Sequence, residues 1–268
     1  MKKISELTED EKEHALRLYQ KSIIVDCHQD SKLTDEYVSK MLHSGVTATN
    51  LDGGTLEKIS EKCQVINQCS DVLLGPISTV EEIQEAKREG KTAVFFGCES
   101  AEELLESRER KANLDRLPLF HKLGLRVIQP CYNNRNVFAD GCVEEANGGL
   151  SNLGLELVER MNKHNMIVDC SHVGIKTTFD VCEHARFVVS THSNARVICD
   201  NARNRTDEEI KAIAEKEGVL GIVSFPTFVK WTDAENDKWP SIEDLLDHIV
   251  HIDKLVGIEH VGVGLDLV

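Results

Sequence analysis

Short apolar segments that end in metal-binding residue types recur along this chain. IIVD is followed by Cys27-His28-Gln29-Asp30, TAVFFG by Cys98-Glu99, MIVDC by Ser171-His172, FVVST by His192 and HVGVGL by Asp266. Side chains at the carboxyl ends of several strands converge only when those strands run parallel. In a parallel barrel, that end carries the active site. The pattern predicts a metal-dependent hydrolase on a parallel α/β fold.

Apolar segments alternate with amphipathic ones along the whole sequence. Strands are predicted at 22–27, 46–50, 92–98, 125–130, 166–170, 187–191, 218–224 and 259–265, and helices at 56–73, 80–90, 150–164, 207–217 and 242–256. The strands are continuously apolar, as expected when both faces are covered. A further helix within residues 1–21 has Thr8 and Glu11 spaced as a capping box. We therefore expect one (β/α)₈ TIM-type barrel over residues 1–268, preceded by that helix.

Composition narrows the possible partners. A length of 268 residues suits a single barrel, and a net charge of −15 argues against nucleic acid and against an anionic membrane surface. The amino terminus lacks the apolar region of a signal peptide, and no apolar run approaches the length of a membrane span. Nine scattered cysteines without a C-x-x-C pair favour reduced thiols in the cytoplasm. A homodimer is the default expectation.

The polar residues at the strand ends suit a site for two cations. His28 and Asp30 stand two apart, so on a regular strand they point to the same side. Glu99 could bridge two cations through its two oxygens, or alternatively cap a following helix. His172 and His192 end consecutive predicted strands, and neutral imidazole is a common zinc ligand.

Other residues extend this hypothesis or compete with it. Asp266 could take a proton from the attacking water and return it to a leaving amine. The Asn- and Gly-rich segment 131–149 is long for a loop and would form the rim of the site. His248 and His251 have helical i, i+3 spacing that could also bind a metal, although we favour structural roles for both. Cysteines beside the proposed ligands are more typical of small buried apolar residues than of thiolate ligands.

Taken together, these motifs resemble the membrane (renal) dipeptidase family of binuclear zinc dipeptidases, in a bacterial-type branch. The resemblance covers the chain from about residue 22 to its end. The segments that carry it are VDCHQD at 25–30, GCES at 97–100, GLRVIQPCYNNRNVFADGC at 124–142, GLSNLGLELVERMN at 149–162, IVDCSHVG at 167–174, STHSNARVICDNARNRTDEEI at 190–210 and VGVGLDL at 261–267.

The resemblance implies a complete ligand set and a reaction. His28 and Asp30 match the ligands of one zinc, Glu99 the bridging carboxylate, and His172 and His192 the ligands of the second zinc. The implied reaction is hydrolysis of a dipeptide amide by a hydroxide shared between two Zn²⁺ ions. Mn²⁺ and Co²⁺ accept similar ligands and are alternatives.

Three further residues match functional positions of the family. Asp266 matches its acid/base aspartate, and Arg203 is similar to the arginine that grips the substrate carboxylate. Tyr132 occupies a place where many relatives have a histidine that contacts the substrate and its developing oxyanion, so a substrate-binding and catalytic role is expected for it. A phenol can donate a hydrogen bond there but cannot become a cation.

The sequence departs from the family at its end. The family continues for some tens of residues past the strand-eight aspartate, whereas this sequence stops at LDLV. The barrel is therefore expected to lack its C-terminal helices, either as a fragment or by loss, and to be less stable than an extended form. Two alternative functions stay open: an amidohydrolase-type enzyme acting on a cyclic amide or phosphoester, and a non-catalytic metal-binding barrel.

Overall fold

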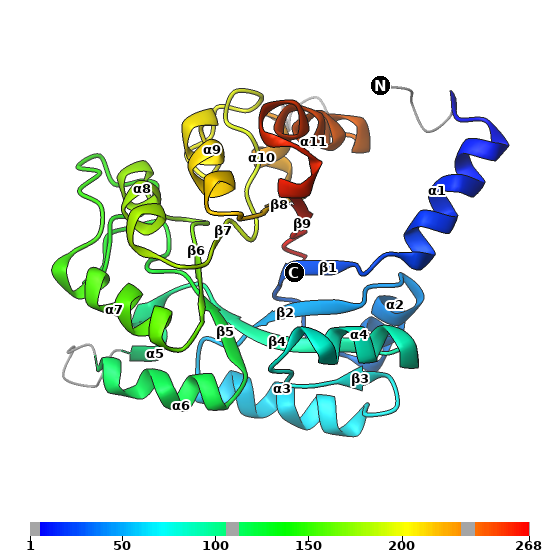
Figure 1. Cartoon of the computed structure of the whole chain (residues 1–268), viewed down its shortest axis with the longest axis horizontal. Coiled ribbons are helices and arrows are strands. Elements are labelled where there is room, and N and C mark those ends of the chain that lie inside the picture. The colour runs from blue at the N-terminus through cyan, green and yellow to red at the C-terminus, as the bar shows by residue number, and fades with distance from the viewer. Residues whose placement is uncertain (1–5, 106–112, 232–238, 268) are drawn as a thin grey trace.

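Eight parallel strands form the barrel in the computed structural model, which describes residues 6–105, 113–231 and 239–267 (Figure 1). They are β1 (Val25–Gln29), β2 (Ala48–Asp52), β4 (Thr92–Cys98), β5 (Leu125–Ile128), β6 (Ile167–Asp169), β7 (Val188–Val189), β8 (Leu220–Ile222) and β9 (Val261–Val263). Their order is β7-β6-β5-β4-β2-β1-β9-β8. A parallel bridge between Ser190 and Leu220 joins the two ends. The predicted (β/α)₈ fold is confirmed.

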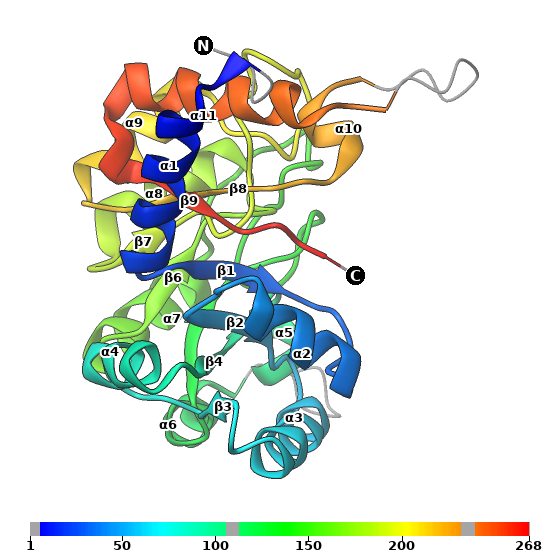
Figure 2. The ribbon, with the colours of Figure 1, turned by 90° about the vertical axis from the view of Figure 1, so that its right-hand side faces the viewer.

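One strand lies outside this path. The short β3 (Leu73–Leu74) pairs only with β4, beside the barrel. Leu73 was predicted at the end of a helix instead, because a strand of two residues is too short to show an apolar pattern. Figure 2 shows β1 and β9 side by side, so the first and last barrel strands are neighbours.

Helices cover the outside of the barrel. They are α1 (Glu9–Lys21), α2 (Asp35–His43), α3 (Leu56–Gln68), α4 (Val80–Glu89), α5 (Ala101–Leu105), α6 (Leu117–Lys122), α7 (Asn152–Lys163), α8 (Ile175–His184), α9 (Asp207–Glu215), α10 (Pro226–Val229) and α11 (Ile242–Val256), with 3₁₀ turns at Leu114–Arg116 and Ile258–His260. Five of the predicted helices correspond to α3, α4, α7, α9 and α11. The sequence analysis missed α8, which begins without a side-chain cap and is rich in β-branched residues of modest helix propensity.

The first helix differs from the others in its packing. Thr8 and Glu11 form the predicted capping box, but no residue of α1 is buried (Figure 1). The Tyr19 hydroxyl donates a hydrogen bond to the carbonyl of Ser44, which ties the end of α1 to the end of α2. No helix within the described ranges is both long and apolar enough to cross a lipid bilayer.

Apolar side chains pack the first residues of β1, β2 and β4 against α4. Ala48 pairs in register with Val25 on one side and with Ala93 on the other. These residues pack in one cluster with Ile77 and with Ala86 of α4. Small apolar side chains at the start of these strands therefore hold α4 against the barrel.

Candidate metal centre

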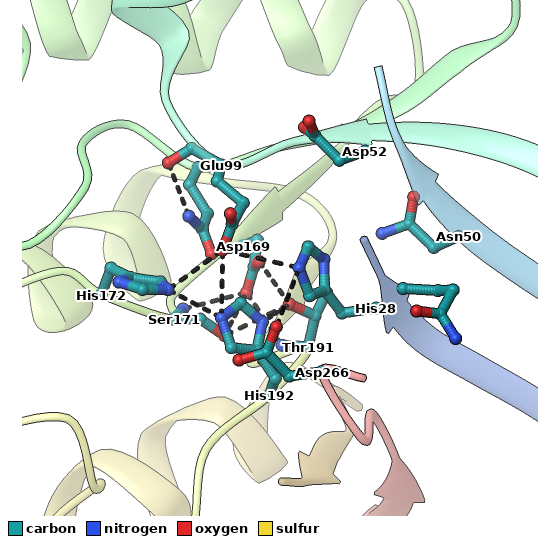
Figure 3. A network of polar contacts seen from close by, with 12 residues as sticks. His28, Asn50, Asp52, Glu99, Asp169, Ser171, His172, Thr191, His192 and Asp266 are labelled. Atoms are coloured by element: carbon teal, nitrogen blue, oxygen red, sulfur yellow. Dashed lines mark hydrogen bonds and ion pairs between the residues drawn. The ribbon is translucent and has the colours of Figure 1, made fainter. Parts of the chain in front are cut away.

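Donor atoms from four strand ends meet at the carboxyl end of the barrel (Figure 3). The ligand atoms of His28, Glu99 and His192 all lie within 4.8 Å of one another. Glu99 Oε1 lies 3.5 Å from His28 Nε2, 3.1 Å from His172 Nε2 and 3.3 Å from His192 Nε2. These four residues, hereafter the His/Glu cluster, come from the ends of β1, β4, β6 and β7. The sequence predicted all four as metal ligands.

Hydrogen bonds determine which nitrogen of His192 carries the proton. The Thr191 hydroxyl donates its one hydrogen to Asp169 Oδ2 over 2.5 Å. It can then only accept from His192 Nδ1, 2.8 Å away. The proton of His192 therefore lies on Nδ1, and its Nε2 presents a lone pair to the cluster.

The same reasoning applies to His172. Its Nδ1 lies 2.9 Å from Asn133 Oδ1, an amide oxygen that can only accept a hydrogen bond. The proton of His172 is therefore on Nδ1, and Nε2 again presents a lone pair. The two Nε2 atoms are 2.7 Å apart. Two lone pairs at this distance, facing a carboxylate oxygen, form a site made only of acceptors.

Burial keeps these imidazoles neutral. It lowers the pKa of His28 to about 3, with the neighbouring His192 as the next cause. It also lowers the pKa of His172 and of His192, and in both cases the Arg203 guanidinium adds to the effect. Burial raises the pKa of Glu99, while His28 opposes that rise. His28 Nε2 is buried and has no hydrogen-bond partner among the described residues.

The donor set fits divalent cations. Neutral imidazole nitrogens and a carboxylate are ligands that zinc accepts in proteins. A cation between the acceptor atoms would relieve the contact between His172 and His192 and would satisfy the orphaned nitrogen of His28. The cysteines fit less well: burial raises the pKa of Cys98 and of Cys27, which keeps both as thiols, and the Cys98 thiol donates to the carbonyl of Ser100.

Asp30 is the predicted ligand that the structure does not bring into the cluster. Its side chain is exposed, and it is absent from the group of converging ligand atoms. His28 and Asp30 point to the same side only on a regular strand. The pairing of β1 with β2 shifts register between Asp26 and Gln29, so β1 is not regular there. This irregularity breaks the alternation of side chains. Asp30 is still close enough for its charge to raise the pKa of Glu99. Its role as a ligand stays a prediction.

Asp266 lies next to the cluster, as predicted. Its Oδ1 is 3.5 Å from His28 Nε2, and its backbone N–H points to the carbonyl of His28 at 3.4 Å. Burial raises the pKa of Asp266 to about 6, and the charge of Glu99 adds to this rise. A carboxyl group with a pKa near the working pH can both take and return a proton.

Arg203 provides a buried cation beside the cluster. Only 5% of its surface is exposed, and its Nη2 donates to the carbonyl of His192 over 3.3 Å. Its Nε and Nη1 are buried and have no hydrogen-bond partner in the segments that the structure describes. Burial lowers the pKa of Arg203 to about 10, and the positive charge of Arg205 adds to this effect. A charged guanidinium with unpaired N–H groups is suited to bind a carboxylate.

Tyr132 borders the cluster from the loop after β5. Its ring stacks on the ring of His172, with centroids 4.0 Å apart, and 48% of the residue is exposed. The loop is tied to the neighbouring strand end, because the N–H of Cys142 donates to the carbonyl of His172. The predicted rim of the site is therefore connected directly to one of its histidines.

Sequence reasoning missed the residues that support the cluster: Asp169, Thr191, Asn133 and Asp26. One signal was present in the repeated tripeptide V-D-C, at 25–27 and 168–170. In each copy the buried aspartate accepts from the N–H two residues later and from an N–H of the neighbouring strand end, Leu265 for Asp26 and Thr191 for Asp169. Hence an aspartate at the end of an apolar strand was itself informative.

The competing histidine pair has structural partners. His248 Nδ1 accepts from the N–H of Ala195, and its Nε2 donates to the carbonyl of Val229. His251 contacts Asp207 at 2.8 Å. Because the two rings turn to different partners, they do not form a joint metal site, and the structural interpretation is confirmed.

Solved structures with the same fold include two bacterial proteins. An amidohydrolase from Pseudomonas aeruginosa matches 94% of this chain and 76% of its own, with a TM-score of 0.82 and 28% sequence identity. A metallo peptidase from Rhodobacter sphaeroides, liganded with a phosphinate mimic of the dipeptide L-Ala-D-Ala, matches 91% of this chain and 86% of its own. Its TM-score is 0.78, and its 21% identity makes it a likeness of fold.

Relatives in sequence include two fungal proteins. Dipeptidase verJ of Clonostachys rogersoniana is 32% identical over 216 residues, which cover 79% of this chain and 52% of the relative. Dipeptidase aclJ of Aspergillus oryzae is 30% identical over 217 residues, which cover 79% of this chain and 49% of the relative. This chain thus spans about half the length of these relatives. The family model described as membrane dipeptidase, peptidase family M19, matches residues 22–267, and the chain therefore belongs to that family.

Proposed function

We propose that this protein hydrolyses dipeptides and that it uses two divalent cations, with Zn²⁺ as the first choice. The observation that carries the proposal is the His/Glu cluster, where lone pairs of His172 and His192 face each other at 2.7 Å beside Glu99. Membership of the membrane dipeptidase family supports dipeptides as the substrate class. Mn²⁺ and Co²⁺ prefer similar ligands and are alternatives.

The residues of the cluster would hold the cations. The Nε2 atoms of His28, His172 and His192 all lie within 3.5 Å of one oxygen of Glu99, Oε1. The second oxygen of this carboxylate would then be available to a second cation. When bound, the cations would supply a water molecule of lowered pKa as the nucleophile and would polarise the scissile carbonyl. Asp30, whose side chain is exposed, would add a carboxylate ligand to one cation if its loop turned toward the His/Glu cluster.

Arg203 would bind the free carboxylate of the substrate. Its Nε and Nη1 are buried without partners in the described part of the chain, and each has an N–H to offer to a carboxylate oxygen. The two lie on different edges of the guanidinium, so a bidentate pair would combine one of them with Nη2. An ionic anchor beside the reacting bond fixes how far the substrate carboxylate lies from the cluster. Such an anchor would favour dipeptides over longer peptides, whose terminal carboxylate would lie too far from the scissile bond.

Asp266 and Tyr132 would act on the reacting atoms. Asp266 has a raised pKa and a position beside His28, so it can accept the proton of the attacking water and deliver it to the leaving amine. The Tyr132 hydroxyl, on a half-exposed ring stacked on His172, would donate a hydrogen bond to the developing oxyanion.

Hydrolysis of simple dipeptides by the purified protein tests this function. The protein with added Zn²⁺ should cleave L-Xaa-L-Xaa and L-Xaa-D-Xaa dipeptides. A chelator should abolish the activity, and added Zn²⁺ should restore it. Full occupancy by metal without hydrolysis of any dipeptide would contradict the proposal and would favour a non-catalytic metal-binding barrel.

A second candidate is a related amide hydrolase. The similar structure from Pseudomonas aeruginosa is described as an amidohydrolase, which supports testing cyclic amides and phosphoesters. Such enzymes often use a carboxylated lysine as the bridging ligand, but Pro130 and Cys131 follow β5 here, and Glu99 takes the central place. Faster turnover of lactams or phosphotriesters than of dipeptides would favour this alternative.

We place the protein in the cytoplasm, as its sequence suggests. All nine cysteines are free thiols, which agrees with a reducing compartment. Fractionation of the source cells, with immunodetection of the protein, tests this placement.

A further inference from the structure

A fully connected hydrogen-bond network lies behind His192. Asp169 Oδ1 accepts from three donors, namely the N–H of Ser171, the hydroxyl of Ser171 and the N–H of Thr191, each at 2.9 Å. Asp169 Oδ2 accepts from the Thr191 hydroxyl, which in turn accepts from His192 Nδ1. The Asp169 carboxylate can only accept, so it sets the direction of the hydrogen bonds that run through Thr191 to His192 (Figure 3).

The network is shielded from solvent. Asp169, Ser171, Thr191 and His192 are all 3% exposed or less. The N–H of His192 also donates to the Ser171 hydroxyl at 3.0 Å, so the backbone of His192 is held as well as its ring. In such surroundings a buried polar group needs a partner, and an interrupted chain of hydrogen bonds is costly.

We propose that Asp169 and Thr191 are positioning residues that impose the Nδ1–H tautomer on His192 and so keep its Nε2 free for a metal ion. This inference rests on the proposed metal site, but it concerns residues that do not touch the cations. Groups that hydrogen-bond to ligating histidines fix their tautomer and orientation, and their loss typically weakens metal binding by about 10- to 100-fold.

The arrangement makes a directional prediction for Asp169→Asn. The three donors at Oδ1 require an acceptor there, so the amide oxygen must occupy that place and the amide NH₂ must face Thr191. The NH₂ would donate to the Thr191 hydroxyl, which would then donate to His192 Nδ1. The tautomer would reverse, and a proton on Nε2 would block metal binding.

Thr191→Val removes the connection instead of reversing it. Valine keeps the shape and the backbone N–H to Asp169 but has no hydroxyl for His192. Thr191→Ser restores the hydroxyl and serves as the rescue variant. Thr49→Val is the matched control, because Thr49, in β2, is as fully buried as Thr191, and its hydroxyl has no hydrogen-bond partner within the part of the chain that the structure describes.

The test combines two measurements on the full chain. The tautomer of His192 is read from ¹⁵N-histidine NMR spectra of the metal-free protein, with His192→Gln to assign the signal. Zinc affinity is measured by competition with a chromogenic chelator. We expect Nδ1–H for wild type, Thr191→Ser and Thr49→Val, a mixture for Thr191→Val, and Nε2–H for Asp169→Asn. Zinc affinity at one position should fall about 10- to 100-fold in the last two variants.

Specific results would overturn the inference. They are an Nε2–H tautomer in wild type, an unchanged tautomer and affinity in Thr191→Val, or a loss in Thr49→Val equal to that in Thr191→Val. If Asp169→Asn does not fold, the valine and serine variants still decide. Neither measurement uses hydrolysis, so the inference can hold even if the protein cleaves no dipeptide, and it can fail in an active dipeptidase.

Discussion

The Nε2 atoms of His172 and His192 lie 2.7 Å apart, and neither carries a proton. Asn133 takes the proton of one ring and Thr191 the proton of the other, each through Nδ1. Two lone pairs repel at this distance unless a positive charge lies next to them. These hydrogen bonds leave a site that suits a cation, and the following predictions rest on this relationship.

Replacing a histidine of the cluster should lower the metal content. His192→Ala removes one of the two facing donors, so we expect it to lose at least one of two bound cations and nearly all hydrolytic activity. Metal analysis of the purified protein measures the first effect. His164→Ala is the control, because the ring of His164 lies beside that of His121, with centroids 5.4 Å apart, and is not part of the His/Glu cluster. Equal metal content in wild type and His192→Ala would refute this ligand assignment.

Arg203→Lys should discriminate between substrates with and without a free carboxylate. Lysine keeps the charge but cannot offer two parallel N–H groups. For a dipeptide, kcat/KM should fall about 10- to 100-fold, because a hydrogen bond between charged groups contributes about 1.5–3 kcal/mol. For the corresponding dipeptide amide, wild type and variant should differ little. A similar loss on both substrates would show that Arg203 acts on the structure rather than on the carboxylate.

Tyr132→Phe separates the hydroxyl from the ring. Stacking on His172 is retained, so the metal content should not change. The hydrogen bond to the oxyanion is lost, and kcat should fall about 100-fold with little change in KM. Steady-state kinetics on one dipeptide, with metal content measured in parallel, check both parts. An unchanged kcat would remove Tyr132 from the catalytic residues and leave it as a support for His172.

We expect His248 to make the folded protein less stable at low pH. Burial lowers its pKa below the ordinary value of 6.5, and both ring nitrogens already have partners in the neutral form. Below pH 6.5, His248 is protonated in the unfolded chain but stays neutral in the folded chain. The free energy of unfolding therefore falls as the pH drops from 6.5 toward the folded-state pKa of His248. This group contributes at most about 1.4 kcal/mol per pH unit.

Glutamine can replace both hydrogen bonds of His248 without titrating. The free energy of unfolding of the metal-free protein should therefore depend less on pH in His248→Gln than in wild type between pH 6.5 and 5. Urea titrations at several pH values measure this slope. Identical slopes would mean that His248 does not contribute to the acid sensitivity.

Much of the fold follows from the sequence. A parallel barrel strand is apolar on both faces, so it stands out as a continuous apolar run, and all eight were found close to their true bounds. The residues after those runs could be named as candidate ligands, because the ends of parallel strands meet at one edge. β3 was missed because it has only two residues, and α8 because it lacks a side-chain cap and is rich in β-branched residues.

The tertiary structure alone decided how the ligands are held. Local spacing placed Asp30 with His28, but an irregularity in β1 turned Asp30 toward solvent. The proton positions on His172 and His192 depend on Asn133 and Thr191, and the first of these lies in a loop that pattern reasoning could not orient. The pattern of apolar runs shows which residues reach the carboxyl edge of the barrel sheet. Which atom donates in each hydrogen bond depends on contacts between segments that lie far apart in the sequence.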